Sequence, residues 1–520
     1  MDRRSFFKTS GRKKSSFRVQ GGIDPYGGAW TRDEVSHLLK RALFGARETD
    51  IQSFVSMGPE AAIDALFQPQ PLPASPLREY GMVGVEGFMY DDLGVAVGQP
   101  WGDDLNTASD PQARPAINSA RNGSLIKWMM GLMLHQNATI HEKMVLFMHH
   151  HFSVQMGEVD NATMCYRHHM LLRQHAVGNI RELTRLVSKD PAMLRHLNGY
   201  LNSKKAPDEN FARELQELMT VGKGTDSLYT ENDVIAAAKV LTGWRIDDAT
   251  KLARFEASEH DMSTKQFSGF YKGVSISAGD GDTELAALIN MIFGVKETAR
   301  FICRKLYRWF VYHRIEADVE TAVIQPLADL LIAEDYELEP VLKVLLRSDH
   351  FYETARRASY IKNPYDFIVG TLREFNVSFP AMADYSVSYP YFEALAKQGN
   401  RMLMGLFQPP DVSGWPAYYQ EPMFYEMWVN SNSLPRRADF INGVVADGVV
   451  DVRAYANESG SQPDARTLVE TMAGRLLQYP LSATSIDYIV NRFCPSGMPN
   501  DAQLKDIFTF IMNLPEYHLC

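Results

Sequence analysis

The sequence predicts a mostly α-helical protein, and three observations lead to this expectation. Apolar residues recur at the three- and four-residue spacing of amphipathic helices over most of 124–244 and 283–377. Capping residues, glycines and prolines divide these stretches into segments of ordinary helix length. No internal repeat of fixed period is visible, so a repeat architecture is not indicated. We therefore expect residues 28–520 to form a single helical domain that follows a disordered tail at 1–27.

The first predicted helix begins after a capping box. Thr31 and Glu34 are three residues apart. At this spacing the side chain of each residue can accept a hydrogen bond from the backbone N–H of the other. Gly45 then provides a helix stop. Two short helices are expected at 51–57 and 61–67, separated by a Gly-Pro pair. The apolar face of the first helix is formed by Val35, Leu38, Leu39 and Ala42.

Three long irregular segments interrupt the helical pattern. They span about 69–123, 245–282 and 378–433, and helical periodicity returns from Ala465 to the end. The first is rich in Pro, Gly, Asp and Asn, the second predicts a short hairpin, and the third is rich in aromatic residues. Loops of this length inside a domain are more often functional than idle. We therefore expect functional residues in or beside them.

Composition excludes several classes of protein. The chain has 520 residues, of which 45% are hydrophobic and 22% are charged, as in ordinary globular domains. The net charge of −10 and the lack of a long basic run argue against nucleic acid as the partner. No run of about eighteen apolar residues is present, so no transmembrane helix is expected. The four cysteines are widely separated and do not indicate a disulfide framework.

The N-terminus contains a degenerate export motif. Arg3 and Arg4 begin an RRSFFK sequence of the twin-arginine type. A working signal continues with an apolar stretch, but residues 9–16 are polar and basic. We therefore expect a cytoplasmic protein, unless a partner carries it to the periplasm or cell envelope. A disordered basic tail with no export role is the alternative reading.

Histidines are concentrated in one short stretch. Nine of the fourteen lie between His135 and His196, and histidine is both the commonest metal ligand and the side chain that titrates near neutral pH. In a helix over 140–152, His151 lies on the apolar stripe and His149 on nearly the opposite side. Two such residues can bind one metal only where the helix ends or unwinds. The alternative is that both are hydrogen-bonded structural histidines.

Carboxylates follow at helical spacing. Asn210, Glu214 and Glu217 share a stripe that borders an apolar face, where carboxylates must be paired, protonated or metal-bound. Glu214 and Glu217 are therefore candidate ligands or general bases, and a structural network that anchors Arg213 is the alternative. His260 and Asp261 lie in an irregular segment that can direct both side chains towards the same site.

An aromatic segment completes the set of candidates. A rigid loop at 408–416 is followed by a group of aromatic residues that either stack on a sugar or cover the core. No nucleophile elbow, phosphate-binding loop, dinucleotide fingerprint or H-E-x-x-H motif is present. The aromatic residues are Tyr418, Tyr419, Phe424, Tyr425 and Trp428.

Several segments, taken together, resemble the bacterial DUF1800 family of uncharacterised proteins. They are HLLKRALFG at 37–45, MHHHF at 148–152, ENFARE at 209–214, LTGW at 241–244, HD at 260–261 and PPDVSGW at 409–415. The family usually shows Trp-His-Asn-His where this chain has MHHH, so His149 and His151 match and His150 departs. The resemblance implies a cell-envelope role, often with a twin-arginine signal and an export-dependent, sulfatase-like partner.

These observations predict a His/carboxylate site. His149, His151, Glu214 and His260 are the expected metal ligands, and such a mixed set suits iron, zinc or copper. Glu217 and Asp261 are the expected supporting or proton-transfer groups. The reaction would be metal-assisted hydrolysis or oxidation, and the sequence does not choose between them. The competing hypothesis is a non-enzymatic envelope protein that binds a partner protein or a glycan.

Overall fold

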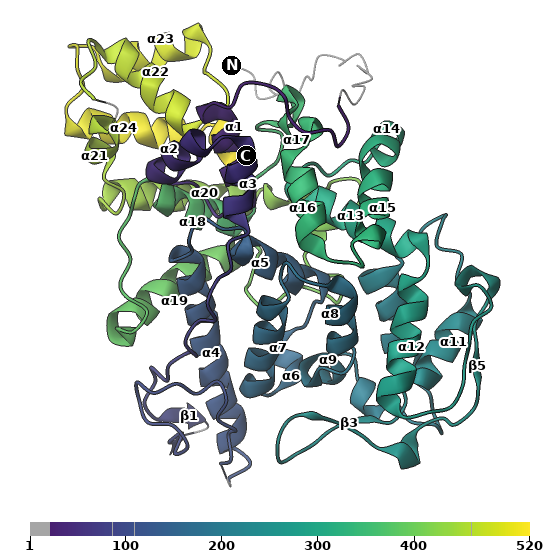
Figure 1. The fold of residues 1–520 in the computed structure, drawn as a ribbon. Coiled ribbons are helices and arrows are strands. Elements are labelled where there is room, and N and C mark those ends of the chain that lie inside the picture. The colour runs from purple at the N-terminus through teal and green to yellow at the C-terminus, as the bar shows by residue number, and fades with distance from the viewer. Residues whose placement is uncertain (1–20, 86, 109, 459) are drawn as a thin grey trace.

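The protein is mostly α-helical, as the sequence predicts (Figure 1). The structure, a computed structural model, describes residues 21–520 except 86, 109 and 459. The motif at Arg3 and Arg4 therefore lies outside the described residues. Within the described chain, no helix combines the length and the apolar character needed to cross a membrane, in agreement with the sequence.

The N-terminal helices form as their capping signals predict. Helix α1 (Arg32–Ala42) begins at a complete capping box, in which the Thr31 side chain accepts a hydrogen bond from the Asp33 N–H. Helices α2 (Glu48–Met57) and α3 (Pro59–Leu66) follow. The predicted apolar face of α1 is fully buried, and it consists of Val35, Leu38, Leu39 and Ala42.

The middle of the molecule contains a group of packed helices that surrounds α5 (His141–His151). The long helix α4 (Ala113–Leu134) packs against both α7 (Ala162–Gln174) and α19 (Tyr385–Arg401). Helix α13 (Lys296–Phe310) lies on the other side and packs against α15 (Gln325–Ala333). Figure 1 shows α5 near the centre of this arrangement.

The remaining helices complete the core and the C-terminal end. Two helical segments, η2 (Leu215–Thr220) and η5 (Glu320–Ile324), are π-helices. The other α-helices are α6 (Met156–Val159), α8 (Ile180–Val187), α9 (Pro191–His196), α10 (Glu209–Glu214), α11 (Glu231–Val240), α12 (Gly281–Phe293), α14 (Ala317–Val319), α16 (Leu338–Arg347), α17 (Asp349–Tyr352), α18 (Pro364–Glu374), α20 (Ser433–Ala446), α21 (Val452–Asn457), α22 (Ala465–Leu476), α23 (Ala483–Phe493) and α24 (Asp501–Met512).

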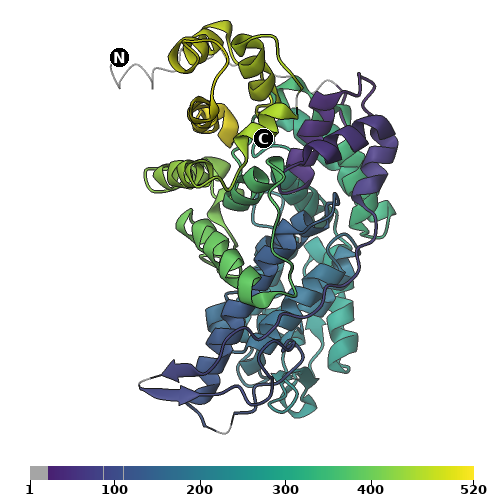
Figure 2. The ribbon, with the colours of Figure 1, turned by 90° about the vertical axis from the view of Figure 1, so that its left-hand side faces the viewer.

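Strands occur only as short antiparallel pairs in the described part of the chain. They are β1 (Val83–Val85) with β2 (Phe88–Tyr90), β3 (Trp244–Ile246) with β4 (Ala253–Phe255), and β5 (Lys265–Gln266) with β6 (Ser275–Ile276). The registers pair Val83 with Tyr90, Trp244 with Phe255 and Lys265 with Ile276. Figure 2 shows the β1–β2 hairpin projecting at the end of the molecule opposite the C-terminal helices.

Two predicted loops are partly helical. Helix α4 begins at Ala113, although the sequence predicted an irregular segment up to residue 123. Pro115 lies in the first turn of α4, where backbone N–H groups have no acceptor within the helix. A proline is therefore tolerated there and does not indicate a loop. Helix α19 lies inside the predicted loop at 378–433 and contains Pro390. Its tertiary packing against α4 outweighs that local penalty. The segment 245–282 is irregular with short hairpins, as predicted.

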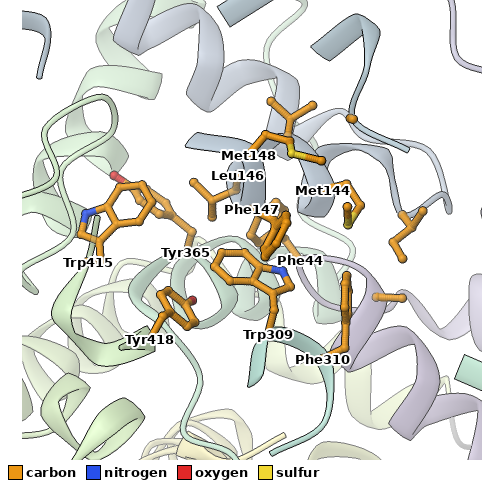
Figure 3. Close-up of a cluster of buried hydrophobic side chains, with 14 of the residues drawn as sticks. Phe44, Met144, Leu146, Phe147, Met148, Trp309, Phe310, Tyr365, Trp415 and Tyr418 are labelled. Atoms are coloured by element: carbon orange, nitrogen blue, oxygen red, sulfur yellow. The ribbon is translucent and has the colours of Figure 1, made fainter. Parts of the chain in front are cut away.

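Buried apolar side chains form one continuous core from Val35 to Cys520. Figure 3 shows the part beneath α5, where Phe147, Trp309, Tyr365, Trp415 and Tyr418 gather from four separate segments. The ring centroids of Trp309 and Tyr418 lie 4.3 Å apart, and those of Phe147 and Trp309 lie 5.4 Å apart. This aromatic cluster fixes the end of α5 against the loop that follows α19.

Candidate functional site

The C-terminal end of α5 is the place where several of the predicted segments meet. The loop at 409–415 is held there by side chains that follow α5. The Ser153 hydroxyl donates to the Asp411 carbonyl at 3.0 Å, and the Gln155 amide donates to the Pro409 carbonyl at 2.9 Å. The rigid loop therefore has a fixed position relative to the histidine run, more than 250 residues earlier in the chain.

His150 packs closely against the loop at Gly414 and Trp415. The Trp415 N–H donates to His150 Nδ1 at 3.2 Å. Gly414 has φ +89°, and a Cβ atom at that position would lie 2.2 Å from His150 Nδ1. Only glycine fits both the backbone conformation and the close approach. Burial, and then the nearby Lys305 charge, hold the pKa of His150 well below its ordinary value. His150 is thus a neutral acceptor that anchors the loop, a task that an asparagine oxygen can also perform.

His149 belongs to a buried polar network between α5 and α7. Its Nε2 lies 2.8 Å from His169 Nδ1, and Arg173 Nε donates to His169 Nε2 at 3.4 Å. Arg173 also makes a two-pronged ion pair with Glu142 at 2.6 and 2.7 Å. Burial lowers the pKa values of His149 and His169 well below 6.5, so both rings are neutral. These contacts correspond to the structural reading of His149.

His151 faces a lysine that the sequence analysis did not single out. Lys305 Nζ lies 3.3 Å from His151 Nδ1 and donates to the Leu218 carbonyl at 3.0 Å. Leu218 belongs to the π-helix η2, a rare conformation that often marks functional sites. Among the described residues no carboxylate pairs with Lys305. Burial, and then the neighbouring Arg308, lower the pKa of Lys305 to about 7.

Glu214 is the last residue of α10 and carries an unsatisfied carboxylate. Its side chain is half-buried and accepts no hydrogen bond from the described residues. Burial raises the pKa of Glu214, and the negative charges of Glu217 and Asp411 raise it further. Glu217 instead contacts Lys223 Nζ at 3.2 Å and Arg213 at 3.9 Å. Glu217 therefore takes part in the network around Arg213, while Glu214 has its polar atoms free.

Asp411 is the second carboxylate of the site, and the sequence analysis missed it. The Ser413 N–H donates to Oδ1 at 2.7 Å, and the Tyr419 hydroxyl donates to Oδ2 at 2.7 Å. Burial and the contact with Asp411 raise the pKa of Tyr419, so Tyr419 stays a donor. The signal that was available is its position in the family-like segment 409–415, directly after two prolines. Its partner Glu214 comes from a segment almost 200 residues earlier.

His260 and Asp261 lie in a different network. His260 is fully buried, with Nε2 at 2.9 Å from Glu284 Oε1 and Nδ1 at 2.8 Å from the Thr242 carbonyl. Glu284 also binds Lys265 Nζ at 2.6 Å. The Asp261 carboxylate accepts a hydrogen bond from the Ser263 N–H at 2.8 Å, and this bond stabilises the local turn at 261–263. These contacts join the β3–β6 region to α12.

The four predicted metal ligands therefore lie in separate networks. His149 contacts His169, His151 contacts Lys305 and His260 contacts Glu284. Glu214 is close enough to Glu217 and Asp411 for their charges to raise its pKa. Within the part of the chain that the structure describes, no three His, Cys, Asp or Glu side chains form a group that could hold a metal ion. The arrangement of donors thus gives the predicted iron, zinc or copper site no support.

The aromatic segment after the loop covers the core and does not present a stacking surface. All but one of its large rings are buried, and Tyr419 is half-buried. Of the two alternatives for this segment, the contacts match the covering role. The buried rings are Trp415, Tyr418, Phe424, Tyr425 and Trp428.

Comparison with known proteins gives one match. Residues 37–519 match the family described as "Protein of unknown function (DUF1800)". No curated protein and no solved structure matches the chain. Because the match covers nearly the whole sequence, the chain belongs to the DUF1800 family.

Proposed function

We propose that the protein is a hydrolase in which Glu214 is the general acid and Asp411 the general base. The observation that carries the proposal is the contrast between these two neighbouring carboxyl groups. Glu214 is half-buried without a hydrogen bond and has a raised pKa, while Asp411 is solvent-exposed and accepts two hydrogen bonds. A desolvated carboxyl group with a raised pKa suits a general acid, and a hydrogen-bonded carboxylate open to solvent suits a general base.

The arrangement supports a simple reaction. The Asp411 carboxylate takes a proton from a water molecule, whose oxygen then bonds to the substrate carbon. As the bond from that carbon to the leaving oxygen breaks, protonated Glu214 gives its proton to the leaving oxygen. Two carboxyl groups with these roles are typical of glycoside hydrolysis, so a glycosidic bond is the substrate class that we propose.

Neighbouring groups help to maintain the difference between the two carboxyl groups. The Glu217 charge favours the protonated form of Glu214, while the nearby Arg213 and Lys223 charges act in the opposite direction without cancelling the rise in the pKa of Glu214. Glu217 itself contacts Lys223 at 3.2 Å and Arg213 at 3.9 Å. The Tyr419 hydroxyl orients the Asp411 carboxylate by donating a hydrogen bond to Oδ2. Of the residues predicted from the sequence, this proposal uses Glu214, expected there as a metal ligand, as a catalytic group, and it retains Glu217 as the supporting group.

The experiment measures turnover of 4-nitrophenyl glycosides by the wild-type protein and by three variants. General acid–base groups typically contribute 10²–10⁴-fold, so we expect Glu214→Gln and Asp411→Asn each to lose activity on that order. The matched control is Glu217→Gln, one helical turn from Glu214, which should lose roughly tenfold or less. Turnover that survives Glu214→Gln unchanged, or wild-type protein inactive on every glycoside tested, would contradict the proposal.

A further inference from the structure

A groove with a volume of about 810 Å³ lies at the end of the molecule opposite the C-terminal helices. The start of α4, the turn between α6 and α7, the end of α9 and the β3–β4 hairpin contribute to its walls, and Figure 1 shows these elements together. Its volume lies in the range of small-molecule and oligomer sites, about 300–1,000 Å³. The groove uses none of the residues of the Glu214–Asp411 site.

Two arginines in the groove have no acidic partner among the described residues. The Arg195 guanidinium lies over the Tyr200 ring, 4.8 Å from its centroid, and both side chains are half-buried. Arg114 is exposed, and within residues 21–520, leaving out 86, 109 and 459, its guanidinium donates only to the Ala108 carbonyl, at 2.6 Å. Elsewhere on this protein arginines are commonly paired, as Arg181 is with Asp335 at 2.7 Å. Unpaired, oriented guanidinium groups are suited to bind carboxylates through two parallel hydrogen bonds.

The floor of the groove is rigid and polar. Asn118 is buried, and its side chain donates to the Asp160 carbonyl at 3.2 Å and accepts from the Ala162 N–H at 3.4 Å. The Asn161 side chain caps α7. These contacts hold Asp160 in a left-handed conformation, with φ 56°. Its carboxylate has no partner in the part of the chain that the structure describes. Left-handed residues of this kind persist where surrounding structure fixes them, often at ligand sites.

The charged side chains of the groove indicate which kind of ligand it can bind. Lys251 and Asp248 pair with each other at 3.2 Å, so two cations and one anion remain free in the groove. That excess of positive charge contrasts with the net charge of −10 of the whole chain. We propose that the groove binds an acidic oligosaccharide, with sugar carboxylates on Arg114 and Arg195 and sugar hydroxyls on Asp160. This inference is independent of the proposed hydrolase activity, because the two sites share no residue.

The test is a calorimetric titration of the full chain with a galacturonic acid tetramer. We expect saturable binding that weakens as salt rises, and a loss of affinity of tenfold or more in Arg195→Gln and in Arg114→Gln. Arg181→Gln is the matched control, because Arg181 also lies over a tyrosine ring, Tyr336, outside the groove. Its affinity should equal that of the wild type. Arg114 is exposed, so its replacement does not depend on core packing.

Three outcomes would overturn the proposal. A neutral chitotetraose that binds as tightly as the galacturonate tetramer would show that the arginines do not select the ligand. A poly-glutamate peptide that binds through Arg195, without binding of the tetramer, would assign the groove to an acidic peptide. Absence of binding by the acidic tetramer would contradict the proposal that the groove is an oligosaccharide site.

Discussion

At the scale of single residues, the chemistry of this protein is set by what each carboxyl or imidazole group contacts. Glu214 and Glu217 are one helical turn apart, yet Glu217 contacts two basic side chains and Glu214 contacts none. The three consecutive histidines also differ in their contacts: the first contacts His169, the second the Trp415 N–H and the third Lys305. Residue type alone therefore does not assign a role within either group.

Gly414 allows a test of the contact that positions Asp411. Replacing it by alanine forces a Cβ into a left-handed residue, 2.2 Å from His150 Nδ1. We expect Gly414→Ala to lower the free energy of unfolding by about 1–3 kcal/mol, measured by urea denaturation.

Gly443→Ala is the control for that measurement. Gly443 lies inside α20, and an added Cβ would meet no atom within 4 Å. Alanine in a helix interior is favoured over glycine by about 1 kcal/mol, so this variant should be as stable as the wild type or more stable. Equal stability of both variants would mean that the loop does not dock on His150.

At the scale of elements, local sequence signals predicted the helices that have strong caps. They failed for segments whose helical conformation depends on tertiary packing. The capping box at Thr31 and the buried face of α1 follow from spacing alone. Helix α19 was missed because Pro390 and its tyrosine-rich sequence read as loop, while its contacts with α4 make it helical. The π-helix η2 was also missed, because inserting one residue into a helical turn leaves no periodicity signal.

The candidate site was predictable only in part, for a related reason. Glu214 could be found because a polar stripe beside an apolar face predicts a partly buried carboxylate. Lys305 could not be found, and the only signal for Asp411 was its place in the family-like segment 409–415. The neighbours of both residues come from segments far away in the chain. The predicted convergence of His260 with Glu214 required the path of the chain between them, which spacing does not give. His260 instead pairs with Glu284, at 2.9 Å.

At the scale of the whole molecule, a core that contains several neutral histidines makes stability depend on pH. Burial lowers the pKa values of His149, His150, His151 and His169 well below 6.5. The unfolded chain binds protons on these residues near pH 6.5, and the folded chain does not. Their contribution to stability is therefore complete above that pH and is lost as the pH falls below it.

We predict a steep loss of stability between pH 6.5 and 5. Each of the four histidines contributes about 1.4 kcal/mol per pH unit, or roughly 5 kcal/mol per unit together. Urea denaturation at several pH values measures this slope. His150→Asn retains the acceptor for the Trp415 N–H but removes one titrating group, so its slope should be smaller by about 1.4 kcal/mol per pH unit. A free energy of unfolding that stays constant from pH 7 to 5 would contradict this account.

The central claim, that Glu214 is a general acid beside the hydrogen-bonded Asp411, is tested most directly by the titration of Glu214. The carboxyl signal of ¹³C-labelled glutamate, assigned by its loss in Glu214→Gln, gives the pKa of this group. We predict a pKa above the ordinary glutamate value of about 4.3. It should fall in Glu217→Gln and in Asp411→Asn, because both charges raise it. A Glu214 pKa at or below the ordinary value, unchanged in both variants, would contradict the account.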